Sequence, residues 1–231
     1  QMSGFFHTFE VMSNIKNYLS LIKFSHTIFA MPFALIGFFL GTIHTNSNLK
    51  WGLLVLVILC MIFARSAAMA FNRYIDREID KANPRTSEKR EIPNGSIKAK
   101  SAFFFVIINC LLFVLTSWFI NKLCFYLSPI ALAIILGYSY TKRFTALCHL
   151  ILGLGLALAP LGAFLAVTAQ FATLPIFFSL AVLFWVGGFD IIYSLQDESF
   201  DKKQNLHSIP VLIGKKKALY LAKVFHFITF F

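Results

Sequence analysis

The acidic residues of this chain are gathered in two short segments, and their gathering predicts chemistry. The chain has ten Asp and Glu residues, and all except Glu10 fall within positions 76–91 or 190–201. Both segments border long apolar stretches, where an unpaired carboxylate costs on the order of a few kcal/mol. A solvated helix end is the alternative explanation. The gathering of nine acidic residues in two segments favours the interpretation that these segments are the two halves of one functional site.

The spacing of the polar residues predicts that each segment lines one face of a helix. Candidates recur at i, i+4 and i+8 in the first segment, and at i, i+7 and i+11 in the second. Oxygen ligands without cysteine or histidine suit Mg²⁺. His149 lacks metal-ligand spacing, so we predict an interfacial or packing histidine rather than a base. The predicted metal ligands are Asn72, Asp76, Asp80, Asp190, Asp197 and Asp201, of which Asp76, Asp80, Asp190 and Asp197 are also predicted to be catalytic.

Basic residues lie beside both acidic segments and at the end of an apolar stretch between them. Lysine and arginine can neutralise the phosphate oxygens that a metal ion leaves uncompensated. Any one of them can also be a charge that sets membrane topology. Together they predict a diphosphate site, and its candidate ligands are Arg77, Arg85, Tyr138, Lys142, Arg143 and Lys202.

Arg65 is a basic residue inside an apolar stretch. It precedes Asn72 by seven residues, and so lies on nearly the same helix face, about 10 Å deeper in the membrane. An unpaired guanidinium is costly there, so Arg65 needs an anion. The anion is either one of the aspartates, in a structural pair, or the carboxylate of a small acidic substrate.

Composition predicts that these residues are positioned by an all-α bundle of transmembrane helices. The chain has 231 residues, of which 58% are hydrophobic and only 13% charged. The net charge of +11 does not indicate nucleic-acid binding, because the basic residues adjoin apolar stretches. We expect one domain over 1–231, without a cleavable signal peptide. The predicted spans are about 20–43, 51–75, 101–120, 124–140, 147–169 and 174–195, with a seventh beginning near Ala218.

The basic residues predict the orientation of the bundle. If the N-terminus is cytoplasmic, the outside loops hold only Lys50 and Lys122, which fits the positive-inside rule. Both acidic segments and the polar loops at 77–100 and 198–217 then face the cytoplasm. The segments around Asn72 and Asp190 also form a weak internal repeat, since each is a span that ends in spaced acids before a basic loop.

The two acidic segments resemble the two aspartate-rich motifs of the UbiA superfamily of intramembrane aromatic prenyltransferases. The first reads NRYIDREID at 72–80, and the second reads DIIYSLQD at 190–197, followed by Asp201. The similarity extends through 83–86, 138–143 and 206–210. It is greatest to the 4-hydroxybenzoate polyprenyltransferase branch, whose first motif often begins Asn-Arg where other branches have Asn-Asp.

The resemblance implies nine spans around a central cavity with both motifs at its cytoplasmic end, in a bacterial inner membrane. The chain would hold six spans and the start of a seventh, so we expect it to lack the last spans. The implied activity is Mg²⁺-dependent transfer of a polyprenyl group from its diphosphate to the ring of a small aromatic acid. That acid is 4-hydroxybenzoate, on a route to quinones, and its predicted contacts are Arg65, Asn72 and Tyr193.

Two alternatives remain open. A hydroxynaphthoate acceptor, as in menaquinone biosynthesis, also presents a carboxylate beside a hydroxylated ring. A cation-coupled transporter also carries paired acids within a membrane domain.

Overall fold

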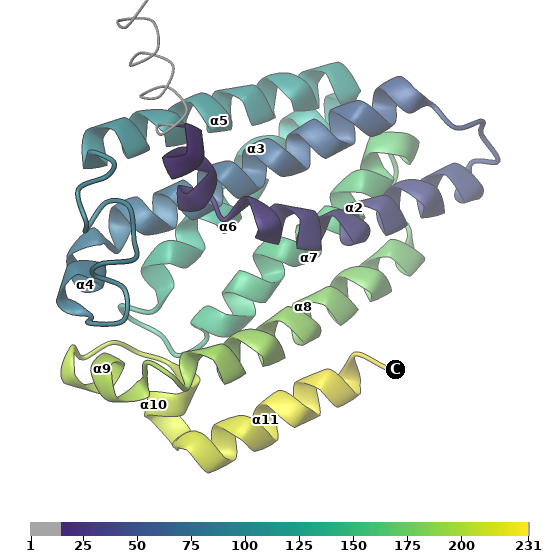
Figure 1. Cartoon of the computed structure of the whole chain (residues 1–231). Helices are drawn as coiled ribbons and strands as arrows, with labels where there is room; N and C mark the ends of the chain where they lie inside the picture. Colours follow the sequence, from purple (N-terminus) through teal and green to yellow (C-terminus); the bar gives the residue numbers. More distant parts are fainter. Residues whose placement is uncertain (1–14, 231) are drawn as a thin grey trace, which may run out of the picture.

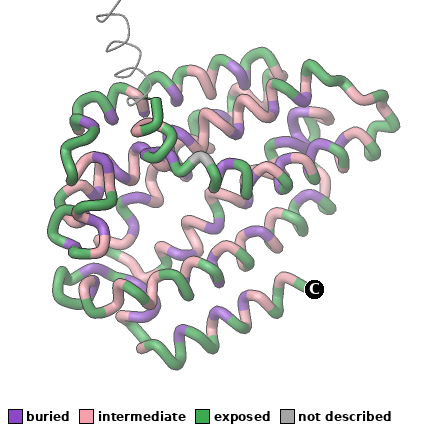
Figure 2. The backbone as a smooth tube through the Cα atoms, viewed as in Figure 1, coloured by how far each residue is buried: buried purple, intermediate pink, exposed green. Residues whose placement is uncertain are grey.

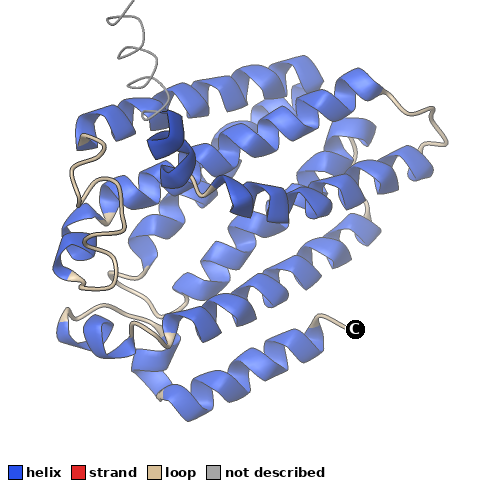
Figure 3. Cartoon of the chain, viewed as in Figure 1, coloured by secondary structure: helices blue, strands red, loops and turns tan. Residues whose placement is uncertain are grey.

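The computed structural model describes residues 15–230, except the side chains of Phe24 and His26, and all regular structure in this range is helical (Figure 3). Glu10 and the N-terminus, which the charge pattern assigns to the cytoplasm, lie outside the described residues. Six described helices are long and apolar enough to cross a bilayer, which confirms the predicted polytopic all-α bundle. They are α2 (Phe24–His44), α3 (Trp51–Ile75), α5 (Ala99–Ile120), α6 (Lys122–Thr141), α7 (Cys148–Thr168) and α8 (Thr173–Ser194).

The two ends of the described chain differ in detail from the predicted spans. The first span was expected to begin near position 20, but the helix over 15–21 ends there and α2 starts only at Phe24. Lys23 takes a left-handed conformation with φ 47°, which interrupts the helix. At the other end, α11 (Lys215–Ile228) begins slightly before the expected start at Ala218 and packs along α8 (Figure 1).

Glycines let the central helices approach closely. A Cβ atom added to Gly37 would lie 1.9 Å from the carbonyl oxygen of Pro160, where α2 crosses α7. A Cβ atom on Gly153 would lie 2.4 Å from the carbonyl oxygen of Leu183, where α7 crosses α8. Both distances are too short for any side chain, so a glycine at each crossing lets the two helix backbones touch, as is common in membranes.

The outward faces of the helices are apolar. Large exposed side chains include Phe104 and Phe119 on α5 and Phe177 and Phe189 on α8. Buried positions lie between the helices, and exposed positions follow their outer sides (Figure 2). A surface of this kind suits hydrocarbon, so the fold is that of an integral membrane protein.

Three short helices gather at one end of the bundle, opposite the connection between α2 and α3 (Figure 1). Each follows a long helix or a loop next to one of the acidic segments. They are α4 (Arg77–Ala82), α9 (Glu198–Lys203) and α10 (Ile209–Ile213).

The close crossing of α2 and α7 can be tested by Gly37→Ala. The added methyl group would overlap the Pro160 carbonyl, and such overpacking costs about 1–3 kcal/mol, so the unfolding temperature in detergent should fall. The matched change Gly137→Ala adds a methyl group that meets nothing within 4 Å. It should leave the unfolding temperature unchanged or raise it slightly, because alanine favours a helix over glycine. Equal unfolding temperatures for the two variants would show that the crossing does not depend on Gly37.

Candidate active site

The two acidic segments lie at the same end of the bundle and share one local construction. Asp76 follows the last residue of α3, and the Asp80 amide donates to the Asp76 carbonyl at 2.8 Å. Asp197 lies between α8 and α9, and the Asp201 amide donates to the Asp197 carbonyl at 2.8 Å. The prediction that each acidic segment lines one face of a single continuous helix is therefore wrong. Asp76 (ψ 6°) and Asp197 (ψ 0°) leave the α-helical conformation, so each motif straddles two helices.

The two aspartates of the first motif are buried and are held by arginines. Asp76 and Asp80 are only 3% and 4% exposed. Asp76 accepts hydrogen bonds from Arg143 at 2.9 Å and from the Asn72 amide at 3.1 Å, while Arg90 donates to Asp80. Burial raises the pKa of the Asp76 carboxyl, although nearby positive charges oppose the shift. Asn72 and Asp76, predicted to share a helix face one turn apart, are thus in direct contact.

Asp197 connects the second motif to the loop that follows the first. Its Oδ1 atom accepts from Arg85 Nε at 2.8 Å and from Asn83 Nδ2 at 3.2 Å, and Arg85 also donates to Oδ2. Arg85 donates further to the Tyr193 hydroxyl at 3.1 Å. Partial burial of Asp197 opposes ionisation, but the hydrogen bonds from Arg85 and Asn83 outweigh it and lower the pKa of the carboxyl. Arg85 therefore joins the second motif to the loop that follows the first.

The other two acids of the second motif have different basic partners. Asp201 is buried, and the Lys142 Nζ atom lies 4.0 Å from its Oδ1 atom. Burial raises the pKa of the Asp201 carboxyl, and the charge of Lys142 opposes the shift. Asp190 Oδ2 lies 2.7 Å from His149 Nδ1. His149 is buried, as predicted for a packing histidine, but α7 also carries it to a predicted metal ligand 41 residues away, and no local spacing could reveal that contact.

The remaining predicted diphosphate ligands differ in their location. Tyr138 borders the internal cavity described below. Arg77 does not reach the aspartates, because it donates to the Tyr74 carbonyl and lies beside Glu78. Lys202 is exposed on α9 and forms no ion pair with any described residue.

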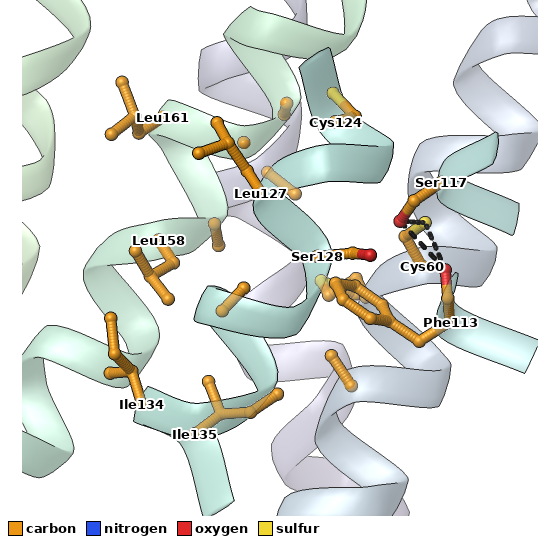
Figure 4. A pocket seen from close by; sticks show the side chains of 18 of the residues that line it. Cys60, Phe113, Ser117, Cys124, Leu127, Ser128, Ile134, Ile135, Leu158 and Leu161 are labelled. Atoms are coloured by element: carbon orange, nitrogen blue, oxygen red, sulfur yellow. Dashed lines mark hydrogen bonds between the residues drawn. The ribbon is translucent and has the colours of Figure 1, made fainter. Parts of the chain in front are cut away.

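An apolar cavity of about 290 Å³ lies among α2, α3, α5, α6 and α7. Leu127, Ile134 and Leu158 line one side, and Cys60 and Ser117 lie together on another (Figure 4). Its length along α6 suits an extended hydrocarbon chain, since the residues from Cys124 to Tyr138 border it and span about 20 Å.

Arg65 borders this cavity without an anionic partner. Its Nε atom is buried and has no hydrogen-bond partner in the described part of the chain. Within residues 15–230 it also forms no ion pair, so the alternative of a structural pair with an aspartate is not realised. A guanidinium left unpaired beside a cavity is suited to bind an anionic group there.

The donor chemistry at the polar end fits Mg²⁺. Among the described residues no three His, Cys, Asp or Glu side chains converge on one point, because each candidate aspartate faces a basic partner. Convergence of three is not required, since Mg²⁺ commonly takes one or two carboxylates together with water and substrate phosphate oxygens. The residues therefore fit a metal ion that binds together with a phosphorylated ligand.

Fold and site together define an intramembrane protein with two aspartate-rich motifs above an apolar cavity. Residues 30–231 match the UbiA prenyltransferase family, and the chain belongs to this family. Two solved structures share its fold. A UbiA homologue from Aeropyrum pernix K1 has a TM-score of 0.81 and 32% identity, over 89% of this chain and 76% of that one. A UbiA homologue from Archaeoglobus fulgidus bound to DMAPP and Mg²⁺ has a TM-score of 0.73 and 24% identity, over 92% and 76%.

Curated relatives include two bacterial 4-hydroxybenzoate octaprenyltransferases. The protein of Tolumonas auensis is 31% identical over 170 residues, which cover 73% of this chain and 59% of the relative. The protein of Vesicomyosocius okutanii is 32% identical over 163 residues, which cover 71% and 59%. The chain therefore spans 59% of the length of either relative.

The opposite pKa shifts of Asp197 and Asp201 predict opposite effects of neutral substitutions. Asp197, with its pKa lowered by folding, contributes stability above about pH 4 and loses it as the pH falls further. Asp201, with its pKa raised, contributes stability when protonated and loses it as the pH rises. At pH 7.5, Asp197→Asn should lower the unfolding temperature by about 2–5 °C, whereas Asp201→Asn should raise it or leave it unchanged.

Unfolding temperatures of both variants, measured in detergent at pH 7.5 and pH 4, check this expectation. The difference between the variants should narrow at the lower pH. Equal destabilisation by the two substitutions at pH 7.5 would contradict the assignment.

Proposed function

We propose that this chain carries the site of a Mg²⁺-dependent prenyltransferase, which transfers a polyprenyl group from polyprenyl diphosphate to the ring of 4-hydroxybenzoate in quinone biosynthesis. One observation carries the proposal: both aspartate motifs and the bases that end α6 lie at the polar end of the bundle. The apolar cavity of this bundle is bordered by Arg65, which has no anionic partner among residues 15–230. The names of the curated relatives support this choice of reaction.

The diphosphate would bind between the two motifs. Asn72, Asp76, Asp80, Asp190, Asp197 and Asp201 would hold Mg²⁺, which makes diphosphate a better leaving group by stabilising the charge that develops on it. Lys142 and Arg143, side by side at the end of α6, would hold the remaining diphosphate oxygens. Their positions support this role, because Lys142 reaches toward the second motif and Arg143 binds Asp76 of the first.

The aromatic acid would bind in the cavity beneath the diphosphate. Its carboxylate would accept hydrogen bonds from Arg65, whose Nε atom has no partner in the described part of the chain. Tyr138 borders the same cavity, and Asn72 lies on the same helix as Arg65. As the allylic C–O bond breaks, the ring carbon beside the hydroxyl would attack the allylic carbon, and loss of the ring proton would restore aromaticity. The apolar walls of the cavity would hold the isoprenoid chain.

We also infer that this site faces the cytoplasm in a bacterial inner membrane. The support is the positive-inside rule, because Arg77, Arg85, Lys142 and Arg143 lie at the end with the motifs. Lys50 lies at the opposite end, in the connection between α2 and α3.

A direct assay tests the reaction. The protein in lipid, supplied with polyprenyl diphosphate, Mg²⁺ and 4-hydroxybenzoate, should form a prenylated acid, and removal of the metal by EDTA should stop product formation. A preference for a hydroxynaphthoate in the same assay would contradict 4-hydroxybenzoate as the acceptor and would support the alternative reaction in menaquinone biosynthesis. Cation flux in liposomes without any prenylated product would instead identify a transporter.

The proposed role of Arg65 predicts a selective kinetic defect. Arg65→Ala should raise the KM for the aromatic acid about 10–100-fold, as expected for loss of a charge-assisted pair, while the KM for the diphosphate changes less than about two-fold. Lys203→Ala serves as a control, because Lys203 is an exposed basic residue at the same end of the bundle. It should leave both constants unchanged. An unchanged acceptor KM in Arg65→Ala would remove Arg65 from the acceptor site.

A further inference from the structure

His149 is a buried residue at the start of α7 with both ring nitrogens engaged. Its exposure is 2%. The Nδ1 atom lies 2.7 Å from Asp190 Oδ2, and the backbone N–H of Ile209 donates to Nε2 at 3.3 Å. One imidazole ring thus connects a predicted metal ligand on α8 to the first residue of α10.

The second of these bonds determines the tautomer of the ring. A backbone N–H can only donate, so Nε2 of His149 must present its lone pair to Ile209. The proton of the neutral imidazole is then on Nδ1 and is donated to Asp190. This assignment follows from the hydrogen-bond network around the ring. Asp190 Oδ1 accepts no hydrogen bond from any described residue, and so stays available to a ligand.

The surroundings of His149 make it a firm support. One turn further along α7, Gly153 lies in backbone contact with Leu183 of α8, so the two helices cannot slide apart easily. On the other side, α10 is capped by Ser208, whose hydroxyl accepts from the Val211 amide at 3.4 Å. The ring is therefore held by elements that are themselves fixed.

We propose that His149 is a positioning residue for the metal-diphosphate site: it orients Asp190 through Nδ1–H and couples that orientation, through Nε2, to the docking of α10. The inference rests on the proposed function. Hydrogen bonds that orient metal-binding carboxylates are commonly worth about 10–100-fold in metal affinity, and loss of the Asp190 bond should produce an effect of this size.

Two substitutions separate the two hydrogen bonds. In His149→Asn the side-chain amide lies near the former Nδ1 position, so a donor to Asp190 is retained and the acceptor for Ile209 is lost. In His149→Gln the amide oxygen can reach the former Nε2 position, so the acceptor is retained and the donor is lost. Each variant therefore reports on one bond.

The measurement is binding of Mn²⁺ to the detergent-solubilised protein, followed by the electron paramagnetic resonance signal of free Mn²⁺, in the presence of a nonhydrolysable prenyl thiolodiphosphate. His149→Gln should bind Mn²⁺ about 10–100-fold more weakly, with an unfolding temperature near that of the wild type. His149→Asn should bind Mn²⁺ within about three-fold of the wild type but unfold at a lower temperature, because the Ile209 amide loses its acceptor.

His226→Gln is the matched control. His226 also contacts α8, where its Nε2 atom lies 3.3 Å from the Trp185 carbonyl, and no carboxylate contacts it among the described residues. Its substitution should leave Mn²⁺ affinity unchanged. Wild-type affinity in His149→Gln, or equal loss of affinity in both His149 variants, would overturn the inference while leaving the proposed function intact. Failure of the wild-type protein to bind Mn²⁺ with the thiolodiphosphate would overturn the proposed function and this inference together.

Discussion

The structure depends on charge compensation at one end of an apolar helix bundle. Carboxylates that are partly removed from water must be paired, or they lose several kcal/mol of solvation. In the described chain four of the five motif aspartates face a lysine or an arginine, the fifth accepts a hydrogen bond from a histidine, and most partners come from a distant segment. The pairs are Asp76 with Arg143, Asp80 with Arg90, Asp190 with His149, Asp197 with Arg85 and Asp201 with Lys142.

This compensation also holds the polar end together. Arg85 joins the loop after α4 to Asp197, so the second motif is tied to the loop that follows the first. The end of α6 joins both motifs as well, since Arg143 binds Asp76 and Lys142 faces Asp201. A bound metal ion would bring positive charge to the carboxylates, and a bound diphosphate would bring negative charge to the bases. Under the proposed function, the bases that stabilise the carboxylates would also be the groups that bind the diphosphate.

Much of the fold and of the candidate site follows from local pattern in the sequence. Span lengths come from apolar runs, and the contact between Asn72 and Asp76 follows from one helical turn. The depth of Arg65 in the membrane follows from its spacing of seven residues from Asn72. The cost of removing an unpaired guanidinium from water indicates that Arg65 needs an anion. The predicted spans are confirmed because they depend on one helix at a time, whereas the anion expected at Arg65 stays a prediction.

What the sequence did not reveal depends on tertiary contacts and on local backbone breaks. The motifs were expected on continuous helices, but the chain turns at Asp76 and Asp197 as it leaves the membrane. The contacts of Arg85 with Asp197 and of His149 with Asp190 join residues that are 112 and 41 positions apart. No periodicity relates such pairs, so only the packed bundle shows them.

The central claim is that both motifs form one site for a metal-bound diphosphate. The most direct test is a crystal structure of the protein with Mn²⁺ and an unreactive prenyl diphosphate analogue, with the metal located by its anomalous scattering. We expect metal density between the motifs, about 2.2 Å from carboxylate oxygens of both, with the diphosphate beside Lys142 and Arg143. Metal bound by a single motif, or aspartates that keep all their basic partners while the diphosphate binds elsewhere, would contradict the account.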